Sequence, residues 1–394
     1  MSEVVVVAAA RTPFGRLGGG LAPLTATELG GVAIRAVLDR TATPPGDVEQ
    51  LIMGTVLAAG QGQVPSRQAG LAAGLPPTVP SFTINKVCAS ALKAVNLAAL
   101  LIRAGEAQVV VAGGMESMSR APYLLEDQRF GSKLGDRVTV DSILRDGLCC
   151  PVDGVHMGVH GGDVATELGV SREEQDAWAF RSQMRYRDAL AAGYFADEIL
   201  RVDVHGHPVG ADEQPRPDTT LEKLAQLRPA FAAAGSVAGS VTAGNAPGIN
   251  DGASAVLLMS AERARDAGLT PLGRWVAAGE SAADHEYLAT VPASAIEAAL
   301  ARTRGEVAVG ALRVVEINEA FAAVAITSTR LLEVGEDRVN VNGGAIAVGH
   351  PIGASGARLL MTLLYELRRR GGGYGAAGIC SGMAQGEATI VHVA

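Results

Sequence analysis

Two cysteines stand at turns far apart in the chain, where a thiol can react. Cys88 follows a strand-like run and precedes a long apolar helical pattern, and Cys380 lies in a Gly-Ile-Cys-Ser-Gly segment. The free N–H groups and the dipole of a helix N-terminus favour a thiolate, so Cys88 is a candidate nucleophile. Lowering a thiol pKa from ~8.5 to ~7 takes about 2 kcal/mol. A buried structural cysteine is the alternative interpretation.

Three further positions carry groups that suit thiol chemistry. His350 lies in the glycine-rich run 343–356, where the backbone can approach a ligand closely. The glycine spacing does not fit a dinucleotide fingerprint. Asn318 ends a strand-like run, where its amide can hold a water or stabilise an oxyanion. The alternative interpretations are that Asn318 caps a helix and that His350 satisfies a turn. Gly382 lets a backbone N–H point into a pocket beside Cys380.

Strand and helix patterns alternate in both halves of the chain. In the first half we predict strands at 4–9, 48–56, 78–87 and 107–112, and helices at 27–40, 67–73 and 90–104. In the second half we predict strands at 274–279, 314–318, 339–342, 374–379 and 387–393, and helices at 292–301, 319–333 and 354–370. The alternation favours a mainly parallel sheet covered on both faces. The similar order of elements indicates an internal duplication.

The segment from about 117 to 250 interrupts this alternation. It holds a glycine-rich stretch at 156–162, an amphipathic helix predicted over 172–191, and a Pro-rich polar segment at 206–218. Such an insertion on a rigid scaffold is a usual place for recognition loops.

The composition restricts the class of protein. Lys plus Arg is 33 and Asp plus Glu is 41, for a net charge of −8, which argues against a nucleic-acid or membrane-surface binder. The N-terminus has no signal-peptide pattern, and four cysteines do not form a disulfide framework, so we expect a cytoplasmic protein with reduced thiols. Cys149 and Cys150 are expected to pack as thiols. Neither Cys88 nor Cys380 belongs to a ligand-spaced cluster, so no metal site is expected.

Taken together, several ordered motifs resemble those of the thiolases over nearly the whole chain. They are Arg11-Thr12-Pro13-Phe14-Gly15, Cys88-Ala89-Ser90, 113–119 (Gly-Gly-Met-Glu-Ser-Met-Ser), 242–246 (Thr-Ala-Gly-Asn-Ala), 250–253 (Asn-Asp-Gly-Ala), 318–321 (Asn-Glu-Ala-Phe), and 340–344 running into Gly349-His350-Pro351. The resemblance implies an α/β fold with a duplicated five-layer αβαβα core and an inserted loop domain. It divides the chain into a first core half (1–117 and 251–270), a loop domain (118–250) and a second core half (271–394). It also implies a homodimer or homotetramer.

The resemblance implies roles for the candidate residues. Cys88 would accept the acyl group of an acyl-CoA, with His350 taking its proton, and Cys380 would remove the α-proton of acetyl-CoA. One oxyanion site would use His350 and a water held by Asn318, and the other the backbone N–H groups of Cys88 and Gly382. Coenzyme A is then a substrate of fatty acid metabolism, and no permanently bound cofactor is expected.

Substrate contacts are implied for a second set of residues. Met157, beside His156, would narrow the acyl pocket, and the nucleotide end of coenzyme A would meet Arg216, Asp218 and Lys223, for which a solvated surface run is the alternative. Further substrate contacts are implied at Ala246, Pro247, Gly248 and Phe321. The chain departs from the family at Pro247, where short-chain members often have Ser, and at Met383 and Ala384, where many members have glycines.

Two other functions remain as alternatives. A decarboxylating ketoacyl synthase has a related fold, but a second reactive cysteine such as Cys380 favours a thiolase. A non-catalytic acyl-CoA or lipid carrier would be favoured by the loss of Cys88, His350 or Cys380, and all three are present. A redox-sensing role of the two thiols is a possible side property. The sequence leaves the acyl chain length and the reaction direction open.

Overall fold

The computed structural model describes residues 2–231 and 239–394. Its main sheet has ten strands, in the order β12-β13-β14-β11-β1-β10-β5-β3-β4, with β2 (Gly15–Arg16) paired to β10. The strands of the first half are β1 (Val4–Arg11), β3 (Gln50–Gly54), β4 (Ser81–Ile84), β5 (Val109–Ser117) and β10 (Asn250–Ser260). Those of the second half are β11 (Gly273–Ala282), β12 (Leu312–Ile317), β13 (Gly373–Ser381) and β14 (Gln385–Val393).

The two halves repeat one strand topology. In the first half β4, β3 and β5 are parallel neighbours, and β10 and then β1 follow antiparallel. In the second half β12 and β13 are parallel, and β14 and then β11 follow antiparallel. Only three residue pairs join the two halves of the sheet: Val4–Val6 of β1 pair with Gly273–Trp275 of β11. The internal duplication inferred from element order is therefore visible in the strand pairing.

Two features of the predicted sheet are wrong. Most strand pairs are antiparallel, because β10 and β14 each return between strands that run the other way. The predicted strand 339–342 is a single parallel bridge between Val339 and Val315. The chain turns directly afterwards, with a positive φ of 48° at Asn340 and 81° at Gly343, so no ladder can continue.

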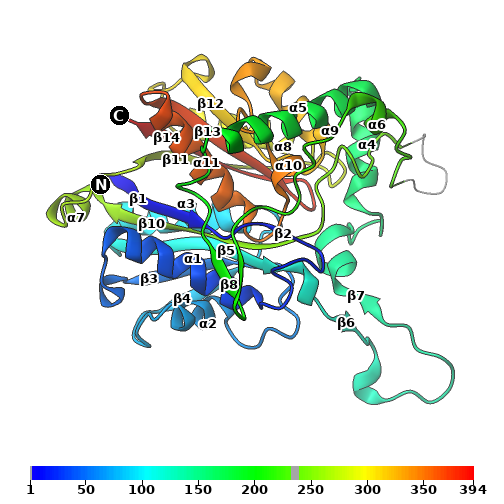
Figure 1. Cartoon of the computed structure of the whole chain (residues 1–394), viewed down its shortest axis with the longest axis horizontal. Helices are drawn as coiled ribbons and strands as arrows, with labels where there is room; N and C mark the ends of the chain where they lie inside the picture. The colour runs from blue at the N-terminus through cyan, green and yellow to red at the C-terminus, as the bar shows by residue number, and fades with distance from the viewer. Residues whose placement is uncertain (1, 232–238) are drawn as a thin grey trace.

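Helices and sheets form five layers (Figure 1). The outer layer of the first half contains α1 (Ala26–Thr41) and α2 (Pro65–Ala72), and that of the second half contains α8 (Val291–Ala301) and α9 (Ala322–Leu331). The central layer contains α3 (Ser90–Ala104) and α11 (Ser355–Arg369), which pack against each other and against both halves of the sheet. The predicted five-layer αβαβα core is confirmed.

The two central helices approach each other closely. A Cβ atom at Gly356 of α11 would collide with the backbone of Leu92 in α3. Residues 87–104, which contain α3, are long and apolar enough to cross a membrane by length and composition alone, but α3 packs in the central layer of the protein. This close packing places the start of α3 beside the loop that precedes α11.

A long insertion connects β5 to β10, where the equivalent strands β13 and β14 are joined by residues 382–384. It contains β6 (Tyr123–Leu124), β7 (Val140–Asp141), α4 (Met157–Glu167), α5 (Arg172–Ala191), β8 (Val202–Val204), β9 (His207–Val209) and α6 (Leu221–Ala225). The predicted helix 172–191 is found with its N-terminus fixed by a capping box of Ser171 and Glu174. The glycine-rich stretch 156–162 forms the start of α4. Two short helices, α7 (Ala261–Asp266) and α10 (Ala345–Val348), complete the fold.

Buried charges fix the insertion on the core. Arg11, in β1, forms a two-point contact with Asp212, with Nη1–Oδ1 and Nη2–Oδ2 distances of 2.7 and 2.9 Å. The backbone N–H of Phe14 and the hydroxyl of Tyr186 in α5 also donate to Asp212. The Arg-Thr-Pro-Phe-Gly motif of the sequence therefore holds the insertion in place.

Candidate active site

Cys88 stands at a sharp turn just before α3. Val87 has a φ of 44°, which is unusual for a β-branched residue. Asn85 Oδ1 accepts a hydrogen bond from the Val87 N–H at 2.9 Å, and Ser90 Oγ donates to the Val87 carbonyl at 2.6 Å. These local bonds stabilise the turn, which places Cys88 at the N-terminal end of α3.

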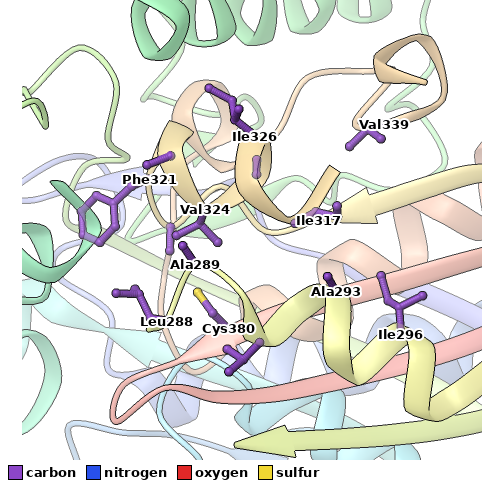
Figure 2. Close-up of a cluster of buried hydrophobic side chains, with 14 of the residues drawn as sticks. Leu288, Ala289, Ala293, Ile296, Ile317, Phe321, Val324, Ile326, Val339 and Cys380 are labelled. Atoms are coloured by element: carbon purple, nitrogen blue, oxygen red, sulfur yellow. The ribbon is translucent and has the colours of Figure 1, made fainter. Parts of the chain in front are cut away.

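The two cysteines meet at one cavity of about 260 Å³. The backbone N–H groups of Cys88 and Gly382 donate to the Cys88 sulfur, and the Cys380 thiol is close enough for its pKa to be raised by Cys88. Ser381 Oγ donates to the Lys86 carbonyl at 2.8 Å and so ties the two cysteine turns together. Cys380 is the next-to-last residue of β13 and lies inside a buried cluster with Leu288, Ala289 and Val324 (Figure 2).

Desolvation decides the ionisation of both thiols, although Cys88 is only half-buried at the cavity and Cys380 is fully buried. Desolvation raises the pKa of Cys88 to about 12, against the opposing backbone N–H groups of Cys88 and Gly382. Burial, and then Cys88, also raise the pKa of Cys380 well above its ordinary value. The prediction of a lowered Cys88 pKa is therefore wrong for this structure, because desolvation outweighs the helix terminus.

His350 is held as a neutral imidazole. Its Nε2 lies 3.4 Å from Nδ2 of Asn318, and its Nδ1 lies 2.6 Å from Oγ of Ser355. Burial, with a smaller contribution from Arg358, lowers the pKa of His350 to about 3. The neutral imidazole can accept the proton of the Cys88 thiol, but with pKa values of about 3 and about 12 the neutral pair strongly predominates over the ion pair in the absence of substrate.

Two buried side chains position the His350 loop. Asn250 Oδ1 accepts the His350 backbone N–H at 2.8 Å. Glu116, at the end of the Gly-Gly-Met-Glu run, accepts the Gly353 N–H at 3.0 Å. It also accepts bonds from Thr55, Val56 and Leu57. Burial raises the pKa of Glu116 to about 7.

Most of the remaining predicted substrate contacts line the same cavity. The wall includes His156, Met157, Ala246, Pro247, Gly248 and Phe321, together with Leu144, Leu148, Phe231, Ile249 and Leu288. The ring of His156 stacks on Phe231 at 4.0 Å, and its Nδ1 accepts the Gly158 N–H at the start of α4. Burial lowers the pKa of His156 to about 4, so this ring is neutral as well.

Three predicted residues lie elsewhere. Arg216, Asp218 and Lys223 are exposed on the insertion and do not line the cavity. Lys223 Nζ lies 2.8 Å from Oδ2 of Asp218. Their assignment to the nucleotide end of coenzyme A stays a prediction.

Sequence reasoning did not assign roles to Ser355, Glu116 and Ser381. Ser381 directly follows Cys380, Ser355 lies five residues after His350, and Glu116 lies in the 113–119 motif, so these positions were the available signal. The departures at Met383 and Ala384 have a structural meaning, since their φ angles are 64° and 44°. Glycine is the residue that adopts this backbone without strain, which explains why glycines suit the turn.

Comparison with known proteins identifies the family of this chain. Residues 4–262 match the family described as "Thiolase, N-terminal domain", and residues 269–393 match "Thiolase, C-terminal domain". The chain belongs to the thiolase family. The thiolase is 48% identical to "Acetyl-CoA acetyltransferase" of Chromobacterium violaceum, over 99% of each chain. It is 47% identical to "Acetyl-CoA acetyltransferase" of Cupriavidus necator over 100% of each chain, and 46% identical to "Probable acetyl-CoA acyltransferase" of Staphylococcus epidermidis over 99% of each.

The family membership confirms the resemblance, the fold class and the class of activity predicted from the sequence. This thiolase is an acyltransferase. The two alternatives, a decarboxylating ketoacyl synthase and a non-catalytic carrier, are not favoured by a family match that spans both halves of the chain.

Proposed function

We propose that this thiolase transfers an acyl group between coenzyme A thioesters through a thioester on Cys88. The observation that carries the proposal is the convergence of two thiols, one neutral imidazole and two backbone N–H groups on one cavity. The names of the relatives support acetyl-CoA as a substrate. The reaction is the condensation of two acyl-CoA molecules or, in reverse, the thiolysis of a 3-oxoacyl-CoA by coenzyme A.

In the first half-reaction the Cys88 sulfur attacks the thioester carbonyl. Its proton passes to Nε2 of His350, which is unprotonated because the pKa of His350 is lowered to about 3. The tetrahedral intermediate expels the coenzyme A thiolate, which takes the proton from His350. The products are acyl-Cys88 and free coenzyme A.

In the second half-reaction Cys380 first gives its own proton to His350, which is neutral again and lines the same cavity, and the Cys380 thiolate then removes the α-proton of acetyl-CoA. Burial raises the pKa of Cys380, so its thiolate is a stronger base than an ordinary thiolate. The enolate carbon attacks the acyl-Cys88 carbonyl and forms a carbon–carbon bond. The carbon–sulfur bond to Cys88 breaks, the Cys88 thiolate takes the proton from His350, and 3-oxoacyl-CoA is released.

Two sets of donors suit the oxyanions of these steps. The N–H groups of Cys88 and Gly382 both reach the Cys88 sulfur, next to which an acyl oxygen would lie. At the other position, Asn318 and His350 are in contact. Asn318 Oδ1 is buried and accepts no hydrogen bond from the described residues, which suits the predicted role of Asn318 in holding a water. One such donor is typically worth ~3 kcal/mol.

We extend the proposal to features that accompany this chemistry. We propose contacts to the acyl and pantetheine parts at His156, Met157, Ala246, Pro247, Gly248 and Phe321, and to the nucleotide at Arg216, Asp218 and Lys223. A homodimer or homotetramer in the cytoplasm, a role in fatty acid metabolism, and the division of the chain at residues 117, 250 and 270 are proposed as well.

The test is thiolysis of acetoacetyl-CoA and of a medium-chain 3-oxoacyl-CoA at equal concentration. We expect turnover by the wild type, loss of turnover in Cys88→Ala and Cys380→Ala, and full activity in the matched variant Cys149→Ala. Incubation with acetyl-CoA is expected to add one acetyl group to wild type and to Cys380→Ala, but none to Cys88→Ala. Turnover that survives in Cys88→Ala would contradict the covalent mechanism.

The same assay separates the substrate classes. Activity restricted to acetoacetyl-CoA would place the enzyme with the short-chain type. Equal or faster cleavage of the medium-chain substrate would place it with the degradative type. If the wild type turned over neither substrate, the result would support the alternative of a non-catalytic acyl-CoA or lipid carrier.

A further inference from the structure

Four metal-binding side chains gather behind the cavity wall, and the reaction proposed above uses none of them. They are Cys150, Asp153, His160 and His285, and one ligand atom from each lies within 4.8 Å of the others. Oδ2 of Asp153 lies 2.7 Å from Nε2 of His160 and 3.5 Å from Nε2 of His285. We propose that these four residues bind one zinc ion.

The local backbone points three of the ligands to one place. The Cys150 N–H donates to the Val155 carbonyl and the Gly154 N–H to the Cys150 carbonyl, which closes a tight loop. Within this loop the Val155 N–H donates to Oδ1 of Asp153, so Oδ2 is left to face the two histidines. His160 follows in α4, a short way along the chain.

The fourth ligand comes from a distant part of the chain. His285 lies in the connection between β11 and α8, and its ring is 5.5 Å from that of His160. The site therefore joins the insertion to the second core half. This explains why the sequence predicted no metal site: three ligands lie close together, but the fourth is placed there only by folding.

The ligand set fits zinc. Thiolate and imidazole ligands favour zinc over magnesium or calcium, which prefer oxygen. A tetrahedral zinc with bonds of about 2.0–2.3 Å separates its ligand atoms by roughly 3.3–3.8 Å. The separations here bracket this range, so small side-chain movements suffice. Cys150 is fully buried and His160 nearly so, whereas Asp153 and His285 are partly exposed and leave a path from solvent.

Four protein ligands leave no open position, which is typical of a structural site. The site lies close to the catalytic turn, since the Cys150 sulfur is 3.9 Å from the sulfur of Met383. Along the chain, His156 of the cavity wall lies between Asp153 and His160, and Leu288 of the wall lies three residues after His285. Zinc binding would displace the Cys150 thiol proton to solvent and brace this wall.

The experiment measures zinc directly. The untagged full-length protein is dialysed against a chelator, reloaded with zinc chloride, desalted, and analysed for metal by mass spectrometry. We expect one zinc per chain and a higher melting temperature than in the metal-free protein. Cys150→Ser, Asp153→Asn, His160→Asn and His285→Asn are each expected to lose zinc affinity by roughly 10-fold or more.

Matched variants locate the metal. Cys149→Ser removes the neighbouring thiol, and His207→Asn removes an exposed histidine on β9; both are expected to bind zinc as the wild type does. The double variant Cys88→Ala/Cys380→Ala is also expected to keep its zinc. Loss of zinc in that double variant would overturn the proposal by placing the metal at the catalytic thiols.

Cobalt gives a readout that does not depend on the folding of the four ligand variants. Cobalt-loaded wild type is expected to show a thiolate-to-metal charge-transfer band that persists in Cys149→Ser. The proposal is overturned if the wild type binds less than one zinc per two chains, if cobalt shows no such band, or if Cys150→Ser and Asp153→Asn bind zinc as the wild type does.

Discussion

The hydroxyl of Ser355 lies 2.6 Å from Nδ1 of His350 and donates its own hydrogen to the Pro351 carbonyl at 2.9 Å. Because that hydrogen is engaged, the Ser355 oxygen accepts a hydrogen bond from Nδ1–H of His350. This fixes the tautomer in which Nε2 carries the lone pair, which faces the Nδ2 group of Asn318 at 3.4 Å. Ser355 is therefore a positioning residue for the base that takes the Cys88 proton.

Removing the Ser355 hydroxyl is expected to impair His350 without changing substrate binding. In Ser355→Ala the preferred tautomer is lost, and we expect kcat to fall about 10-fold or more with KM within twofold of the wild-type value. Steady-state thiolysis of acetoacetyl-CoA measures this. Ser355→Thr retains a hydroxyl and serves as the conservative control. A KM increase at constant kcat would show that Ser355 acts on binding and not on the base.

The two catalytic thiols are expected to react slowly near neutral pH in the absence of substrate. Desolvation raises the pKa of Cys88 to about 12. As long as the pH is below that value, the fraction of Cys88 present as thiolate grows about tenfold for each unit by which the pH rises. His350, with its pKa lowered to about 3, supplies no positive charge to oppose this at neutral pH. We expect the rate of Cys88 alkylation by iodoacetamide to rise steadily from pH 7 to pH 9.

Cys380→Ala serves as the background for that measurement, and peptide mass spectrometry follows Cys88 alone. A rate that is already constant below pH 8 would mean that Cys88 and His350 form an ion pair. That result would contradict the neutral pair described here.

Glu319 is expected to matter for stability. Its carboxylate accepts hydrogen bonds from the indole of Trp178, Ser182 Oγ, Asn340 Nδ2 and the Ile346 N–H, and so joins α5 to the loop before His350. Glu319→Ala leaves these buried donors unpaired, at a cost of about 1–3 kcal/mol for each donor that finds no water. We expect the free energy of unfolding in urea to fall by at least ~3 kcal/mol.

The loss of unfolding free energy in Ser182→Ala is the reference value for the loss in Glu319→Ala. It removes one donor to Glu319 and one acceptor for the Gly344 N–H, and we expect a loss of about 1–3 kcal/mol. If Glu319→Ala cost no more than Ser182→Ala, the carboxylate would not be the shared anchor of these elements.

Arg216 tests the proposed nucleotide contact. The guanidinium is exposed on the insertion, and a charge-assisted hydrogen bond to a phosphate is worth about 1.5–3 kcal/mol. We expect Arg216→Ala to raise the KM for acetyl-CoA about tenfold at constant kcat, and the exposed Arg187→Ala to leave both unchanged. Equal KM values in the two variants would support the surface interpretation of this segment.

The sequence by itself determined those features that depend on neighbours along the chain. The bounds of α3 and α5 were predicted correctly, because helical periodicity and the capping residue Ser171 act over a few residues. The motifs around Cys88 and His350 indicated the family for a similar reason, because each motif consists of residue types in a fixed order within a short stretch of the chain.

Tertiary structure decided whatever depends on residues brought together from distant parts of the chain. It made the sheet mostly antiparallel, reduced the strand at Val339 to one bridge, and half-buried Cys88 at a cavity where desolvation raises its pKa to about 12. It also placed His285 beside Cys150, and Gly382 beside Cys88. Desolvation and ligand geometry depend on which groups surround an atom in space, and the order of residues along the chain does not contain that information directly.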